Sequence, residues 1–298
     1  MPLISIILPT YNVEKYIARA LESCINQTLK DIEIIVVDDK GQDKSIDIAK
    51  EFANRDDRMM IVHNKENLKL LHARAEGVKV ATSDLIMFLD PDDELELNAC
   101  EIAYRAMVDG GGYTIVDMLC FNFCKITNKD KVFENIFIDN IYKTKDFIQY
   151  IININKCYWN LCNKVFKKSL YLNILKFNLN NIIMAEDALC FFILLNHANT
   201  IKTLKNNLYL YYQNNLDSST ITNDLLKLER ALNDEKYVIN IINDFNTIDI
   251  NIVKLKNNIL KKLKNYHNER KMIYYNLKFP YIKSIIKIFY KTIKKVKV

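Results

Sequence analysis

The chain has 298 residues, half of them hydrophobic and 26% charged, which is typical of a globular protein and excludes a disordered chain. Its length allows one large α/β domain with a smaller appendage, and because no apolar run reaches about eighteen residues we expect no membrane-spanning helix. The net charge of +6 hides an asymmetry between an acidic body and a basic carboxyl-terminal segment.

The amino-terminal part of the chain alternates between apolar runs and helical patterns. The apolar runs predict buried strands over residues 3–8, 32–39, 59–63 and 85–89. Apolar residues at intervals of three and four predict helices over residues 14–29, about 43–54 and about 69–81. Strands that alternate with helices form right-handed βαβ units, so we expect a parallel sheet.

After the glycine triplet at residues 110–112, which marks a loop or a boundary, the pattern is less regular. We expect a strand over residues 116–123 and helices over about 142–155 and about 185–197. Residues 208–221 resemble a strand that ends in a polar loop, and from residue 222 onward we expect mainly helix. The expected division is two halves of one α/β domain and a helical region: 1–112, 113–222 and 223–298.

Polar residues follow three of the predicted strands. Residues 9–11 follow the first strand and residues 38–39 the second, while Asp90, Asp92 and Asp93 follow the fourth. Ligands bind beyond the carboxyl ends of parallel strands, so these residues are expected along one crevice. Carboxylate oxygens suit Mg²⁺ or Mn²⁺ that is completed by a substrate's phosphates. The pattern predicts a nucleotide-diphosphate site, although an Asp-Pro-Asp-Asp sequence alone is also typical of a turn.

Two other nucleotide-binding classes are disfavoured by missing motifs. No G-x-G-x-x-G follows the first strand and no G-x-x-x-x-G-K-[ST] is present, which argues against a dinucleotide oxidoreductase and a phosphate-loop NTPase. A nucleotidyltransferase normally has a glycine-rich phosphate loop near its amino terminus, and residues 9–12 are unlike one. With five glycines in the chain, we expect side chains and metal to grip the phosphates.

Two long stretches resemble the signature of a known family. Residues 5–52, which begin SIILPTYN, and residues 72–97, which contain FLDPDDELEL, are similar to the inverting, family-two glycosyltransferases of the GT-A fold. MAEDALCF (184–191) and LYLYYQNNLDSSTI (208–221) resemble the later landmarks of that family. Within it, the chain is most similar to bacterial lipooligosaccharide β-1,3-galactosyltransferases. The resemblance implies a Rossmann-like GT-A fold, with a mostly parallel sheet, flanking helices and a C-terminal helical region.

The resemblance also implies a reaction. A hexose, galactose in first place, passes from a UDP-sugar to a terminal sugar of lipooligosaccharide, GalNAc in first place, with inversion and a β-1,3 linkage. Alternative donors are UDP-GalNAc, UDP-GlcNAc and UDP-glucose, used for capsule or another surface glycan. The alternative from another class is a non-catalytic module that binds a nucleotide sugar or a membrane, in which the carboxylates Asp90, Asp92 and Asp187 would be expected to be degraded.

Several residues match the donor-binding positions of the family. Pro9, Thr10 and Tyr11 match the loop that holds the uracil ring, with Tyr11 available for face-on packing. Asp39 matches the acid that contacts the uridine. Arg74 matches a position that faces the diphosphate, where a guanidinium grips two phosphate oxygens at once.

The D-x-D pair of the family corresponds to Asp90, toward the ribose, and Asp92, toward Mn²⁺ or Mg²⁺, with Asp90 as a further metal ligand. The adjacent Asp93 either orients the loop or holds metal-bound water. The chain departs from the family at Lys69, where glycine is usual, and at His72, which we interpret as a solvated helix residue. Tyr211–Gln213 replaces a pattern that in some relatives offers histidine near the metal.

The acceptor side carries the predicted catalytic base. We expect Asp187 to take the acceptor's proton, with Glu186 as the substitute, although acidic residues also simply favour helix amino termini. Trp159 either stacks on a sugar face or packs in the core. Lys164 either reaches a phosphate or is solvated, and we favour the solvated interpretation. The loop 213–220 resembles a lid that closes over the donor.

The carboxyl-terminal segment predicts a membrane-associated helix. Residues 254–298 hold 14 of the 42 Lys and Arg residues and one of the 36 acidic residues, which gives this segment a net charge of +13 and residues 1–253 a net charge of −7. Apolar residues recur at helical spacing opposite the lysines: Ile282, Ile285, Ile286, Phe289, Ile293 and Val296. Such a helix favours an anionic membrane interface, and its alternative is packing on the protein body. Nucleic acid is not expected, because no binding motif accompanies the charge.

The cysteines and the amino terminus indicate a cytoplasmic protein. The seven cysteines are an odd number, and the pairs Cys120/Cys124 and Cys157/Cys162 lack the spacing of a zinc site. We therefore interpret them as reduced, buried thiols. The first residues lack the basic region and cleavage site of a signal peptide. We expect a cytoplasmic protein that associates with the inner face of the cytoplasmic membrane.

Overall fold

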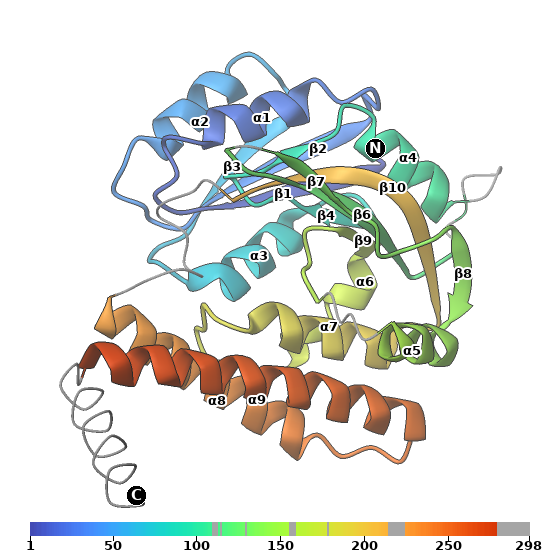
Figure 1. The fold of residues 1–298 in the computed structure, drawn as a ribbon. Coiled ribbons are helices and arrows are strands. Elements are labelled where there is room, and N and C mark those ends of the chain that lie inside the picture. The colour runs from blue at the N-terminus through green and yellow to red at the C-terminus, as the bar shows by residue number, and fades with distance from the viewer. Residues whose placement is uncertain are drawn as a thin grey trace, which may run out of the picture.

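The computed structural model describes residues 1–108, 113, 115–128, 130–154, 159–177, 179–213 and 224–278. Figure 1 shows a mixed sheet with α1 and α2 over one face, α3, α6 and α7 over the other, and a pair of long helices beneath them. The expected α/β fold with flanking helices and a C-terminal helical region is confirmed. The sheet runs without a break from the first expected half of the domain into the second.

The first half of the sheet is parallel, as predicted. Its strands have the order β3-β2-β1-β4 and are connected by helices: β1 (Ile4–Thr10), α1 (Ile17–Ile25), β2 (Ile32–Asp38), α2 (Ser45–Ala53), β3 (Met59–His63), α3 (Lys69–Val80) and β4 (Leu85–Phe88). Gly77 lets α3 approach the sheet closely, because a Cβ there would lie 2.4 Å from Ile7 Cγ2 and 3.0 Å from Val37 Cγ2. The tight packing of α3 places its first turns beside the carboxyl ends of the strands.

The second half of the sheet is mixed and contains short strands that the sequence did not predict. Its elements are β5 (Glu94–Leu95), α4 (Ala99–Met107), β6 (Met118–Ile126), β7 (Lys131–Glu134), β8 (Asn140–Lys143), α5 (Thr144–Asn153), β9 (Lys164–Lys167), α6 (Lys168–Tyr171), the 3₁₀ helix Ile174–Lys176, α7 (Glu186–His197) and β10 (Thr200–Tyr212). β9 joins the two halves, because it pairs antiparallel with both β4 and β6. β10 pairs parallel with β6 and antiparallel with β5, which places its end beside the Asp90–Asp93 turn.

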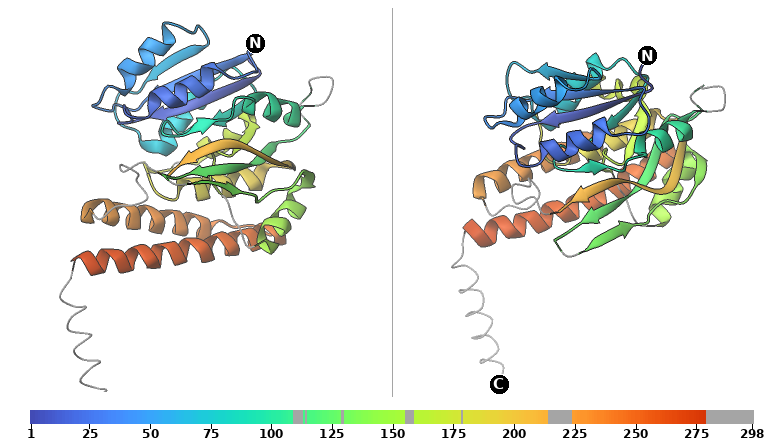
Figure 2. Two further views of the ribbon diagram at one scale, coloured as in Figure 1. Left: turned by 45° about the horizontal axis from the view of Figure 1, so that its top comes forward. Right: turned by 90° about the horizontal axis from the view of Figure 1, so that it is seen from above.

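The C-terminal region is helical wherever the structure describes it. It consists of α8 (Leu225–Asp244) and α9 (Ile250–Lys278), which lie side by side in Figure 1 and Figure 2. The predicted amphipathic tail, from residue 279 on, and residues 214–220 of the predicted lid lie outside the described residues. Among the described residues, none of the helices combines the length and the apolar character needed to cross a membrane.

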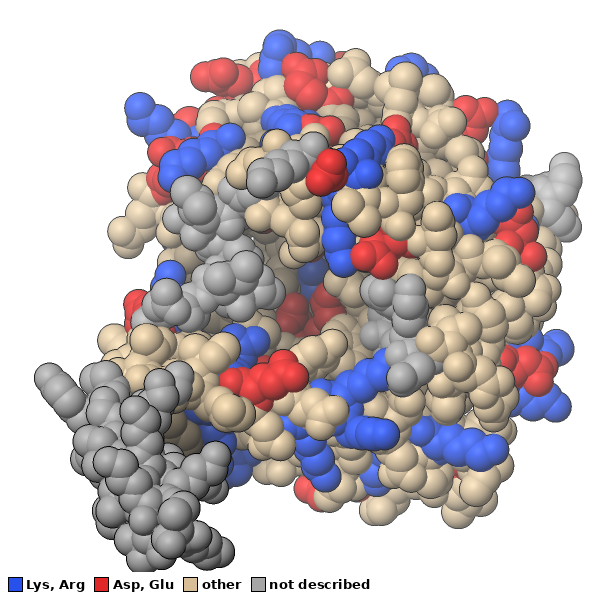
Figure 3. Space-filling view, viewed as in Figure 1, with Lys and Arg blue, Asp and Glu red and all other residues tan. Residues whose placement is uncertain are grey.

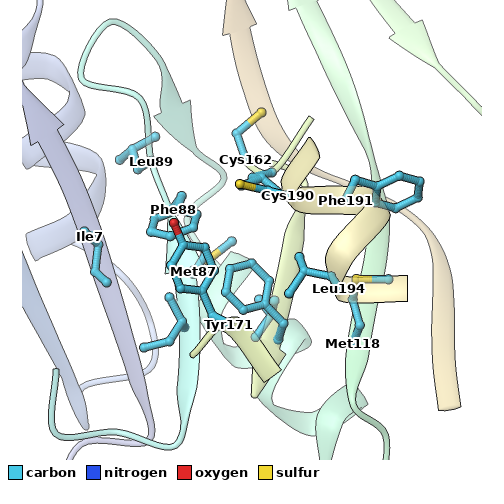
Figure 4. Packing of buried hydrophobic residues seen from close by; sticks show 14 of the residues in the cluster. Ile7, Met87, Phe88, Leu89, Met118, Cys162, Tyr171, Cys190, Phe191 and Leu194 are labelled. Carbon is cyan, nitrogen blue, oxygen red and sulfur yellow. The ribbon is translucent and has the colours of Figure 1, made fainter. Parts of the chain in front are cut away.

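The core links the strand that carries the acidic turn to the helix that carries the predicted base. The Phe88 ring of β4 lies 5.3 Å from the Tyr171 ring of α6 and 5.5 Å from the Phe166 ring of β9. Figure 4 shows Phe88 and Tyr171 on one side of this core, and Cys190, Phe191 and Leu194 of α7 on the other. The six cysteines that the structure describes are buried and free, as predicted, whereas Cys157 lies outside the described residues. This continuous packing fixes the distance between β4 and α7.

Candidate donor and catalytic site

Figure 3, which has the same viewing direction as Figure 1, shows a hollow near the centre of the molecule, with acidic and basic side chains at its floor. In this region three carboxylates that the sequence predicted as site residues surround the buried guanidinium of Arg74. Arg74, from α3, has a side chain that is 2% exposed. Its Nη2 lies 3.0 Å from Asp90 Oδ1, and its Nη1 lies 2.5 Å from Asp187 Oδ1 and 3.6 Å from Glu186 Oε1. The structure thus brings the acidic turn after β4 to the amino terminus of α7.

The charges in this group are unequally compensated. Burial raises the pKa of Glu186 well above its usual value, and the adjacent Asp187 adds to this effect, while Arg74 opposes it. Burial also raises the pKa of Asp90 against the attraction of Arg74. A buried charge is tolerated only with close partners, and one guanidinium does not neutralise three carboxylates. Glu186 is the more deeply buried member of the Glu186–Asp187 pair, 6% exposed, and burial shifts it toward the protonated form.

Arg74 bonds carboxylates of the protein through both terminal nitrogens. Its expected role, to face a diphosphate, stays a prediction. Its Nε is buried and has no hydrogen-bond partner among the described residues. The guanidinium also lies over the Phe88 ring, 5.3 Å from the ring centre. In this state Arg74 connects the donor side of the site to the predicted base.

The turn after β4 is held by β10. Asp93 is 1% exposed, and its carboxylate accepts hydrogen bonds from Tyr209 Oη at 2.6 Å and from the Tyr212 amide at 2.7 Å. The Asp90 amide donates to Tyr209 Oη at 3.2 Å. Of the two expected roles of Asp93, these contacts fit the orientation of the turn.

Arg19 of α1 also holds this turn, a role that could not be predicted from the sequence. Its Nη2 donates to the Asp92 carbonyl oxygen at 2.5 Å, and its Nε lies 2.9 Å from Glu94 Oε1. The guanidinium lies 3.5 Å over the centre of the Tyr212 ring. A basic residue on an amphipathic helix looks like an ordinary solvated position, so only the folded structure shows the contact.

The opposite end of the crevice contains the predicted uridine-binding residues. Asp39 is 3% exposed, and its carboxylate accepts hydrogen bonds from Asn64 Nδ2 and from the amides of Leu68 and Lys69 at 2.7–2.9 Å. Tyr11 is 48% exposed, so its ring is free to pack on a ligand. Asp39 therefore shapes the loop before α3.

Pro9 and Thr10 complete this end of the crevice. Both are buried at the end of β1, and the Thr10 hydroxyl donates to the Leu8 carbonyl oxygen at 3.1 Å. Their side chains support the strand end rather than project from it. Lys69, at the position where the family usually has glycine, has a φ of 67°. The left-handed region favours glycine, which explains the family pattern physically.

Two sequence-based interpretations are wrong. Lys164 is fully buried rather than solvated: its Nζ donates to Asn163 Oδ1 at 2.9 Å and to the Asn160 carbonyl oxygen. The sequence pattern did not predict the strand β9, in which Lys164 is buried. His72 is half-buried on α3, and burial lowers its pKa. It packs where α3 meets the segment that follows α6.

Trp159 contacts the C-terminal helices. It is half-buried, and its ring packs edge-on against Tyr266 of α9, with 5.9 Å between the ring centres. These contacts fit the packing alternative and leave the sugar contact as a prediction. The structure thus assigns Trp159 to the contact between the acceptor half of the domain and the C-terminal helices.

Comparison with known proteins agrees with this fold. The profile described as "Glycosyl transferase family 2" matches residues 5–172. Glycosyltransferase GlyA of Streptococcus pneumoniae is 33% identical over 160 residues, which cover 50% of this chain and 23% of that protein, so the chain spans about a quarter of this relative.

Two solved structures share the fold over most of the chain. S. aureus TarS 1-349 in complex with UDP-GlcNAc has a TM-score of 0.67 at 19% identity, covering 92% of this chain and 79% of the TarS 1-349 chain. The mannosyltransferase PcManGT from Pyrobaculum calidifontis, in complex with GDP-Man and Mn²⁺, has a TM-score of 0.62 at 12% identity, covering 100% of this chain and 81% of that one. At these identities the likeness concerns the fold. Because the family profile matches more than half of its residues, the chain belongs to glycosyl transferase family 2.

Proposed function

We propose that the protein transfers a hexose from a UDP-sugar to an acceptor hydroxyl, with inversion at the anomeric carbon and a divalent metal ion as cofactor. The observation that carries the proposal is the joining of Asp90 and Asp187 through Arg74. In our proposal the turn that contains Asp90 binds a metal-bound diphosphate, and the neighbouring Asp187 carboxylate deprotonates the acceptor. Membership of family 2 supports a nucleotide-sugar donor, and TarS, which shares the fold, has been solved with UDP-GlcNAc.

The acidic turn fits Mn²⁺ or Mg²⁺ held jointly with a substrate. Among the described residues, no three His, Cys, Asp or Glu side chains form a metal site by themselves. In our proposal Asp92, alone or together with Asp90, binds the metal ion. Mg²⁺ commonly uses one or two carboxylates when phosphates complete its coordination. The metal, when bound, supplies positive charge to the departing diphosphate. Arg74 adds a second positive charge at the same end of the site.

Asp187 is the better candidate for the base. Its Oδ2 accepts a hydrogen bond from the Leu161 amide at 3.3 Å, which orients the carboxylate. Glu186 is more deeply buried, and its raised pKa favours the protonated form, which is the poorer proton acceptor. In our proposal Asp187 takes the proton of the acceptor hydroxyl as its oxygen attacks the anomeric carbon, and UDP leaves on the opposite side. Tyr11 packs on the uracil ring.

For the sugar and the linkage we propose galactose and a β-1,3 bond to a terminal GalNAc of lipooligosaccharide. The support is the resemblance of the whole chain to transferases of that kind. A donor other than UDP-galactose, used for another surface glycan, is the alternative, because epimers differ by only a few contacts in a pocket.

We further propose that the protein works at the cytoplasmic face of the membrane, where the basic carboxyl-terminal segment contacts anionic lipid. Support comes from the net charge of residues 254–298 and from exposed apolar side chains near the end of α9: Met272, Ile273, Tyr275 and Leu277. Deleting the residues after Phe279 should lower binding to liposomes that contain anionic lipid, while transfer to a soluble acceptor continues. Equal liposome binding by the shortened protein would contradict this part of the proposal.

The experiment that tests the function is a product analysis. Purified protein is incubated with Mn²⁺, a GalNAc-terminated acceptor and each of UDP-galactose, UDP-GalNAc, UDP-GlcNAc and UDP-glucose, and products are identified by mass and linkage. We expect one hexose added from UDP-galactose, with the β configuration. Transfer from another UDP-sugar would revise the specificity alone. No product and no donor hydrolysis with any of them would refute the proposed activity.

A further inference from the structure

The segment that leads into α7 has a conformation that needs support from outside. Ala185, the residue before the helix, has a φ of 65°. Residues with a side chain rarely adopt this left-handed conformation, and it persists only where surrounding contacts determine it. The two residues that follow are Glu186 and Asp187, which contact Arg74. The backbone at Ala185 therefore decides where the predicted base points.

The support comes from one carboxylate of the C-terminal helices. Asp234 lies on α8, and its Oδ2 accepts hydrogen bonds from the amides of Ile183 at 2.9 Å and Met184 at 3.2 Å. These are the two residues immediately before Ala185. A carboxylate that accepts two backbone N–H groups holds them more firmly than neutral acceptors would, because charge-assisted hydrogen bonds are stronger.

Two further residues of this region hold the same segment. Tyr237, one turn after Asp234 on α8, accepts a hydrogen bond from the Asn180 amide through its Oη at 3.0 Å. Arg270 of α9 places its Nη2 3.6 Å from Met184 Sδ, and its Nε donates to Glu235 Oε1 at 2.9 Å. Glu235 is 2% exposed, so this pair is fixed between the two helices. Residues 180–184 thus lie against a preformed surface of α8 and α9.

We infer that Asp234 is a positioning residue for catalysis: it fixes the backbone of residues 183–185 so that Asp187 faces the acceptor hydroxyl. Asp234 acts through the backbone and bonds none of the residues around Arg74. The inference rests on the proposed function, in which Asp187 is the base. It gives the C-terminal helices a part in the reaction, in addition to any part in membrane contact.

Substitution of Asp234 should lower turnover and leave donor binding nearly unchanged. Asp234→Ala removes both hydrogen bonds, so kcat should fall about 10- to 100-fold, the effect of a small misplacement of a catalytic group. The dissociation constant for UDP with Mn²⁺, measured by calorimetry, should stay within about twofold, because the Asp90–Asp93 turn is held by β10. Asp234→Asn retains an acceptor oxygen and should recover most of kcat. Tyr237→Phe, which keeps the ring, should lose less than Asp234→Ala.

The matched control is Asp244→Ala, which removes an exposed carboxylate from the end of the same helix and should leave kcat unchanged. All assays are run well below the melting temperature of each variant. Asp187→Asn is measured beside them: if it keeps substantial turnover, the assignment of the base fails. If Asp187→Asn is inactive while Asp234→Ala keeps kcat within twofold of the wild type, the positioning role is refuted. Equal losses of kcat and of UDP binding in Asp234→Ala would also refute it.

Discussion

The two carboxylate-bearing segments of the site are held in different ways. The Asp90–Asp93 turn follows a buried strand and is fixed by Tyr209 and Tyr212, which belong to the same sheet. The Glu186–Asp187 pair follows a left-handed residue and is fixed through its preceding amides by Asp234, which belongs to a helix outside the sheet. The first segment is part of the donor scaffold, whereas the second depends on the packing of the C-terminal helices. Binding and catalysis should therefore respond to different substitutions.

The largest expected effect separates the two segments directly. Asp187→Asn should lower kcat about 10²- to 10⁴-fold, the usual contribution of a general base, and should leave the dissociation constant for UDP with Mn²⁺ within about twofold. Initial rates and calorimetry measure the two quantities. Asp84→Asn, at the start of β4 and exposed, is the control. Loss of UDP binding in Asp187→Asn would show that the two segments do not act separately.

A smaller effect is expected at Arg19, on the donor side. Arg19→Met removes the hydrogen bond to the Asp92 carbonyl oxygen and the contact with the Tyr212 ring. We expect the affinity for Mn²⁺ in the presence of UDP to fall about 10-fold, equivalent to about 1.4 kcal/mol, while kcat at saturating Mn²⁺ changes little. Arg55→Met is a matched control, because Arg55 also lies over a ring, that of Phe52, far from the site. An equal effect in both variants, or none at Arg19, would contradict the role.

The amino terminus of α7 should also show its burial in the pH dependence of stability. The pKa of Glu186 is raised by burial in the folded protein and is ordinary, about 4.3, in the unfolded chain. The folded protein thus binds a proton that the unfolded chain has lost, and stability falls as the pH rises from the unfolded pKa toward the folded one. Glu186→Gln avoids this loss. Its free energy of unfolding should exceed that of the wild type by about 1 kcal/mol at pH 7 and by little at pH 4.

Denaturant titrations at several pH values measure this difference. A difference that stays constant with pH, or that grows as the pH falls, would show that Glu186 is ionised in the folded protein. Donor binding by calorimetry should be nearly unchanged, because Glu186 belongs to the catalytic segment.

The smallest effect is expected at the loop before α3. Lys69 adopts a φ of 67°, and Lys69→Gly relieves the backbone strain of this conformation. Glycine also raises the conformational entropy of the unfolded chain, which lowers stability. These opposing terms should leave the free energy of unfolding within about 1 kcal/mol of the wild type, with a slight gain. Donor affinity should persist, because the backbone amide that bonds Asp39 is retained. A loss of more than about tenfold in donor affinity would instead assign the Lys69 side chain to the phosphate site.

The contrast between the two segments also explains what could be predicted from the sequence. Apolar runs predicted β1–β4, and their carboxyl ends placed Asp38, Asp39 and Asp90–Asp93 on one edge of the sheet. The short strands β5, β7, β8 and β9 were missed, because two to four residues carry too little periodicity. Lys164 was misjudged for the same reason, since β9 buries it.

Contacts between distant elements were also beyond the sequence. Family resemblance predicted Arg74 near the diphosphate, but it gave no sign of the bond to Asp187, which lies 113 residues further along the chain. Nothing local marks Arg19 or Asp234, because each acts on a segment about 50 or more residues away. The left-handed conformation of Ala185 likewise has no local signal, since alanine is not the residue that favours it.

The central claim is that the carboxylates after β4 hold a divalent ion that carries a nucleoside diphosphate. Calorimetric titration of UDP in the presence of saturating Mn²⁺ tests it most directly, with wild type and Asp92→Ala compared under the same conditions. The account predicts clear binding heat for the wild type and a loss of affinity of at least about tenfold for Asp92→Ala. Equal binding by both proteins, or no heat with the wild type, would contradict it.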